Sequence, residues 1–109
     1  MKMLGPEASF QSAVIDMARL YGWKVAHFRK ARTKTGWITA VAADGKGWLD
    51  LFLCHEQRGV AIVRELKVPP NKTTPEQDDW IRVLNACRID AKVWVPDDWE
   101  EITTTLSFS

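Results

Sequence analysis

The clearest boundary in this sequence is a change from strand to helix between residues 60 and 77. Residues 60–68 are rich in β-branched and apolar side chains, which favours a strand. Pro69 and Pro70 end that strand, because proline cannot donate a hydrogen bond to a sheet. The next motif, Thr74-Pro75-Glu76-Gln77, opens a helix with a capping-box pattern and proline at the first helical position. A strand followed by a capped helix is typical of the α/β fold class.

The remaining elements alternate along one continuous chain. Apolar residues at helical spacing predict a helix over residues 6–21, and short apolar runs predict further strands. We expect the strand at 23–28 to form a hairpin with the strand at 37–42. We also expect the strand at 49–54 to pair with 60–68. The predicted order is α-β-β-β-β-α-β-α, which ends with a strand at 91–95 and a short helix containing Trp99, Ile102 and Leu106.

Length and composition limit what this chain can be. The 109 residues have room for one hydrophobic core, so residues 1–109 are expected to be a single domain. The net charge of +1 does not by itself indicate a nucleic-acid partner. Cys54 and Cys87 lie in apolar stretches without metal-ligand spacing, which predicts buried free thiols and no zinc site. No segment looks like a signal peptide or a membrane span.

Two carboxylates and a lysine are the strongest candidates for chemistry. Asp50 lies inside the apolar run 48–53, where an ionised group needs a partner unless it points to solvent. Glu65 and Lys67 are two residues apart on a strand and therefore share a face. If the hairpin closes around residues 55–59, Arg64 or Glu65 lies opposite Asp50. This places the carboxylates of Asp50 and Glu65 side by side, which suits Mg²⁺ or Mn²⁺. Taken alone, Glu-x-Lys is equally consistent with an exposed ion pair.

Positive charge is concentrated between residues 24 and 34. A basic loop beside a metal site would contact the phosphate backbone of DNA, although a solvated loop is the alternative. His27 and Arg29 lie on the face of the first strand opposite to that of Phe28. His27 is equally consistent with a DNA contact and with a hydrogen-bonded core histidine. The predicted DNA contacts are His27, Arg29, Lys30, Arg32 and Lys34.

Three motifs together resemble a known family. Gly47-Trp48-Leu49-Asp50, then Glu65-Leu66-Lys67, then Thr74-Pro75-Glu76-Gln77 are similar to the VRR-NUC (virus-type replication-repair nuclease) branch of the PD-(D/E)XK nucleases. The resemblance covers roughly residues 7–96. It departs from the family at Leu49, where proline is usual. The resemblance implies a restriction-endonuclease-like core, in which helices flank a mixed central β-sheet.

The resemblance also implies roles for individual residues. Asp50 and Glu65 would bind the divalent metal together with the main-chain carbonyl of Leu66, and Lys67 would orient or activate the attacking water.

The family pattern adds Glu7 and Gln77 to the catalytic residues. For Glu7 the alternative is a first-turn acid favoured by the helix dipole. Gln77 can instead complete the capping box that Thr74 begins, and the residues leave both roles open.

The function implied is metal-dependent, structure-selective cleavage of branched DNA by an endonuclease that resembles a Holliday junction resolvase or a flap nuclease. Such enzymes are typical of phage or viral replication, recombination and repair. We expect a soluble cytoplasmic protein, in the host cytoplasm if phage-encoded, without an organic cofactor or membrane contact. Symmetrical junction cutting would need a homodimer, whereas a flap-cutting monomer fits the residues equally well. The alternative classes are a non-cleaving nucleic-acid-binding module and an interaction or regulatory protein.

Overall fold

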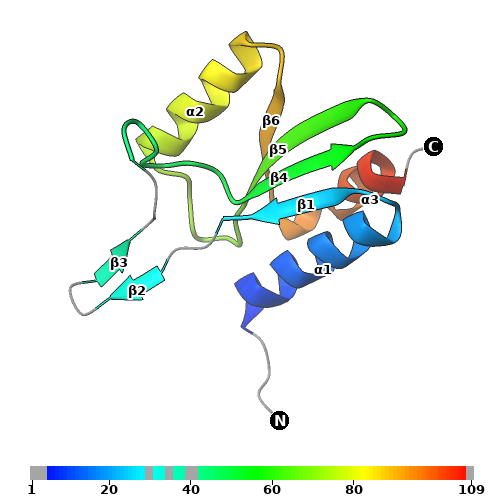
Figure 1. Cartoon of the computed structure of the whole chain (residues 1–109). Helices are drawn as coiled ribbons and strands as arrows, with labels where there is room; N and C mark the ends of the chain where they lie inside the picture. The colour runs from blue at the N-terminus through cyan, green and yellow to red at the C-terminus, as the bar shows by residue number, and fades with distance from the viewer. Residues whose placement is uncertain (1–4, 29–30, 34–35, 39–41, 108–109) are drawn as a thin grey trace.

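Four strands form the central sheet of the protein, in the order β1-β4-β5-β6 (Figure 1). The computed structural model describes residues 5–28, 31–33, 36–38 and 42–107. Strands β1 (Lys24–His27), β4 (Leu51–His55) and β5 (Val60–Leu66) are antiparallel neighbours, and β6 (Asp90–Trp94) runs parallel to β5. The sheet is therefore mixed, as the sequence predicted.

Helices cover both faces of this sheet. Helix α1 (Pro6–Leu20) and helix α3 (Trp99–Ser107), which follows the short 3-10 turn η1 (Pro96–Asp98), lie on one face. Helix α2 (Pro75–Ala86) lies on the other face and makes the crossover that two parallel strands require (Figure 1). No helix in the described ranges combines the length and the apolar character that crossing a bilayer requires.

The alternation of side chains along β5 separates two hydrophobic cores. Ile62 and Leu66 pack into the core beneath α1 and α3, whereas Val63 packs against α2. Because successive strand residues point to opposite faces, Glu65 lies on the α2 face with Val63, as predicted. The α2 face is thus apolar along most of β5 and becomes polar at the end of the strand.

The predicted partner of the first strand was wrong. β1 pairs with β4, with Val25 opposite Leu53, and not with the strand expected at residues 37–42. Strand β3 (Gly36–Ile38) pairs instead with β2 (Ala31–Thr33), which the sequence had placed in a loop, and residues 39–41 lie outside the described part. These two strands form a separate small sheet, so the observed order has one strand more than predicted. Apolar alternation determines which face of a strand is buried but does not specify its neighbour.

The predicted burial of the two cysteines was also wrong. Cys87 is exposed at the end of α2 and Cys54 is half-buried, although both are free as predicted. Trp99 begins α3 and is 37% exposed, because the core beneath that helix is filled by Ile102 and Leu106.

Candidate active site

Glu65 is a buried acid at the end of β5, on the face of the sheet that α2 covers, and the other polar side chains of the site lie around it. Its side chain is only 2% exposed. Oε1 accepts a hydrogen bond from the backbone N–H of Asp50 at 3.1 Å, and Oε2 accepts one from Nε2 of Gln77 at 2.9 Å. The Nζ of Lys67 lies 3.2 Å from the same Oε2. Both oxygens therefore have partners, as a buried carboxylate requires.

Asp50 lies directly beside Glu65. Its Oδ2 accepts a hydrogen bond from the backbone N–H of Leu66 at 2.9 Å, so each carboxylate binds the backbone of the other's strand segment. This reciprocal pairing confirms the side-by-side placement of the two acids. It excludes an Asp50 that points to solvent. The side chain of Lys67 is 16% exposed and that of Glu65 is almost fully buried. The alternative of an exposed ion pair between Glu65 and Lys67 is therefore also excluded.

Burial and mutual repulsion disfavour the state in which Asp50 and Glu65 are both ionised. Burial first, and then the charge of Asp50, raise the pKa of Glu65 to about 7, against the opposing effect of Lys67. Burial also raises the pKa of Asp50, while the Leu66 hydrogen bond and the charges of His27 and Lys67 oppose that rise. When both acids are ionised, the positive charges nearby do not fully compensate their two negative charges.

Gln77 caps α2, and its side chain also contacts Glu65, whereas its catalytic role stays a prediction. Its Oε1 accepts from the backbone N–H of Thr74 at 3.0 Å, and its own N–H donates to the Thr74 hydroxyl at 3.2 Å, which completes the capping box. The amide Nε2 remains available and donates to Glu65. One side chain thus joins the start of α2 to the carboxylate pair and fixes the orientation of Glu65.

Other predicted site residues are less closely connected. His27 pairs with Leu51, which places it on the α1 face, yet its charge lowers the pKa of Asp50. Glu7 is exposed in the first turn of α1, and no contact described for the chain joins it to the carboxylate pair. The metal-ligand role of the Leu66 carbonyl stays a prediction, as do the DNA contacts. Arg29, Lys30 and Lys34 lie outside the described residues, and only the backbone of Arg32, in β2, is described.

Phe28 belongs to the site but was missed at the sequence level. Its backbone N–H donates to the carbonyl of Asp50 at 2.8 Å, so Phe28 lies opposite this acid at the end of β1. The only signal available in the sequence was its place at the end of an apolar run. That signal indicates a position beside Asp50 only when the pairing of β1 with β4 is known.

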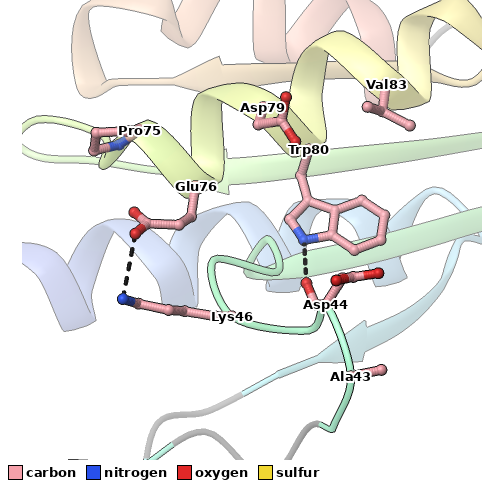
Figure 2. Close-up of a pocket in the computed structure, with 8 residues that line it drawn as sticks. All are labelled: Ala43, Asp44, Lys46, Pro75, Glu76, Asp79, Trp80 and Val83. Atoms are coloured by element: carbon pink, nitrogen blue, oxygen red, sulfur yellow. Dashed lines mark hydrogen bonds and ion pairs between the residues drawn. The ribbon is translucent and has the colours of Figure 1, made fainter.

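A hollow lies beside this site and not within it. It has a volume of about 570 Å³ and lies between the loop before β4 and the first turns of α2 (Figure 2). An ion pair of 3.2 Å between Lys46 and Glu76 and a 3.0 Å hydrogen bond from Trp80 to the carbonyl of Asp44 close its sides. These contacts attach the loop that carries Asp50 to α2. The lining residues are Ala43, Asp44, Lys46, Pro75, Glu76, Asp79, Trp80 and Val83.

A divalent cation fits the Asp50–Glu65 pair in charge and in ligand type. Carboxylate oxygens are the ligands of Mg²⁺ and Mn²⁺, and Mg²⁺ commonly uses one or two carboxylates and retains several waters. Across the described ranges, no group of three or more His, Cys, Asp or Glu side chains could hold a metal ion.

The raised pKa of Glu65 predicts that the metal-free protein loses stability as pH rises. Between the ordinary value of 4.5 and about 7, the folded protein keeps a proton that the unfolded chain has released. The free energy of unfolding therefore falls through this window, by on the order of 3 kcal/mol from Glu65 alone. Urea denaturation in EDTA at pH 4.5 and pH 8 measures this loss.

Asp50→Asn is the matched variant, because asparagine keeps an oxygen to accept from Leu66 but removes the charge beside Glu65. The fall in stability between the two pH values is expected to be clearly smaller in this variant than in wild type. Because all other titrating groups are shared, the difference isolates the carboxylate pair. An identical pH dependence in both proteins contradicts the repulsion described above.

Comparison of the chain with models of protein families, with curated proteins and with solved structures found no match.

Proposed function

We propose that this chain is a divalent-metal-dependent, structure-selective DNA endonuclease with a PD-(D/E)XK fold, similar to the VRR-NUC nucleases. The observation that carries the proposal is the nearly inaccessible Glu65, held against Asp50, Lys67 and Gln77 at one end of a mixed sheet. A buried acid beside a second acid destabilises a fold unless a positive charge or hydrogen bonds compensate the two carboxylates, so such a pair points to a role in binding a cation. Binding a metal ion for phosphodiester hydrolysis is such a role.

Each residue of the site has a distinct task in this reaction. Ionised Asp50 and Glu65 would hold the cation, which would stabilise negative charge on the phosphate and make water more acidic. Gln77 holds Glu65 in position through the 2.9 Å contact. Lys67 is more exposed than Glu65, with which it forms an ion pair. It orients the attacking water and stabilises the charge that develops on phosphate oxygens.

The proposed substrate is branched or otherwise structured DNA, as expected of a phage or viral enzyme of replication, recombination or repair. The basic residues between 24 and 34 supply contacts to the phosphate backbone, which carry no information about base sequence. Selection would then depend on the shape of the DNA. A homodimer would allow symmetrical cutting of a four-way junction, and a monomer would suffice for a flap.

Cleavage assays with wild type and Asp50→Asn test this proposal directly. Labelled four-way junction, flap, single-stranded and linear duplex DNA are incubated with Mg²⁺, Mn²⁺ or EDTA. We expect wild type to cut at least one structured DNA with a metal and none in EDTA, and Asp50→Asn to cut none. If wild type binds these DNAs but cuts none in either metal, the chain is a non-cleaving nucleic-acid-binding module. If it does not bind them, an interaction or regulatory role replaces the nuclease.

A further inference from the structure

A row of side chains crosses the sheet at the candidate site and opens to solvent at one end. Phe28 lies opposite Asp50, Asp50 lies beside Glu65, and Glu65 lies opposite Val93 of β6. Exposure changes steeply along this row, from 40% at Phe28 through half-buried Asp50 to 2% at Glu65. Because buried Gln77 of α2 is hydrogen-bonded to Glu65, the more exposed end of this row is the one at Phe28.

Phe28 is held in place by two further aromatic rings. Its ring contacts that of Trp48 edge-to-face, with centroids 6.0 Å apart, and Trp48 contacts Trp80 in the same way at 5.0 Å. The indole N–H of Trp80 is in turn hydrogen-bonded to the carbonyl of Asp44 (Figure 2). Edge-to-face contacts of this kind stabilise the relative position of the rings. Phe28 therefore presents a large, exposed apolar surface from a supported position beside Asp50.

We propose that Phe28 stacks on an unpaired base next to the phosphate that is cut, so that the preferred substrate has unpaired nucleotides at that point. This inference rests on the proposed nuclease function and narrows its substrate class to flap-like or single-stranded DNA. Stacking on an aromatic ring needs a free base face, and it tolerates any base. In a continuous duplex or a fully paired four-way junction, neighbouring base pairs cover those faces.

Binding measurements separate stacking from cleavage. The affinity of the full chain for a labelled single strand and for a blunt duplex is measured by fluorescence anisotropy in EDTA. Phe28→Leu keeps an apolar side chain against Trp48 but removes the ring, and it should weaken single-strand binding by about tenfold while leaving duplex binding unchanged. Phe28→Tyr keeps the ring and should bind like wild type.

Trp99→Leu is the matched control, because Trp99 is an aromatic residue of similar exposure, 37%, that begins α3, the helix on the opposite face of the sheet. It should leave both affinities unchanged. Circular dichroism checks the fold of each variant, and Phe28→Met replaces Phe28→Leu if the latter is unfolded.

The outcomes for stacking and for cleavage are distinguishable. Equal single-strand affinity of wild type and folded Phe28→Leu overturns the stacking role, whatever the protein cuts, and so does wild type that does not bind single strands. A cutting wild type should prefer the flap to the four-way junction, and Phe28→Leu should lose that preference. If wild type cuts nothing but Phe28→Leu still loses single-strand affinity, the nuclease function fails and the stacking contact stands.

Discussion

Lys67→Ala is expected to slow metal-dependent DNA cleavage by on the order of 10²–10³-fold. Two effects combine in this variant. The ammonium group that lies 3.2 Å from Glu65 Oε2 is lost, and with it the group that orients water and stabilises charge on the phosphate. In addition, Lys67 lowers the pKa of Glu65, so its removal leaves more of this acid protonated near pH 7 and less able to bind a cation.

Single-turnover cleavage at pH 7 and pH 9 separates these two effects. Raising the pH ionises Glu65 and should restore only the part of the rate that was lost through protonation. Lys92→Ala is the matched control, because Lys92 also forms an ion pair with a glutamate, Glu101 at 2.8 Å, but lies away from the site on β6. Cleavage by Lys67→Ala at the wild-type rate would falsify the role proposed for this lysine.

Gly47→Ala is expected to destabilise the protein by roughly 2–5 kcal/mol. Gly47 has φ +82°, and a left-handed conformation costs a residue with a Cβ about 1–2 kcal/mol. The added Cβ would also lie 2.6 Å from Cβ of Glu76 and 2.9 Å from the backbone nitrogen of Gln77, in the first turn of α2. Relieving such an overlap costs about 1–3 kcal/mol more. Urea denaturation measures the loss of stability.

Gly59→Ala separates the two contributions. Gly59 also has a left-handed conformation, with φ +64°, but a Cβ there meets no atom within 4 Å. This variant should therefore lose only about 1–2 kcal/mol. Equal losses in the two variants would show that the contact between the loop and α2 is not tight. In Gly47→Ala, we also expect displacement of Gln77 from Glu65, and therefore weaker cleavage by the fraction that remains folded.

The local features of this site could be predicted well from the sequence. The period of two along residues 60–68 placed Glu65 on the same face as Val63, and the short turn at 55–59 put Asp50 opposite Arg64 or Glu65, of which the structure has Glu65. Proline residues and the capping box located the start of α2 at Pro75. These features depend on neighbours close in the chain, where strand geometry and backbone hydrogen bonding leave few alternatives.

The contacts between distant segments could not be predicted in this way. The hairpin partner predicted for β1 was wrong, and with it the position of Phe28 beside Asp50 was missed. The sequence showed that Gln77 could cap a helix or serve the site, but only packing of α2 on the sheet brought its amide to Glu65.

By itself, then, the sequence determined the α/β class, the strand carrying Glu65, and the start of the helix carrying Gln77. The tertiary structure decided which strand lies next to Asp50, how deeply Glu65 is buried, and which side chain lies at each end of the site. The physical reason is that periodicity and capping act over a few residues, whereas strand neighbours, burial and pKa depend on segments far apart in the chain that meet only in the packed protein.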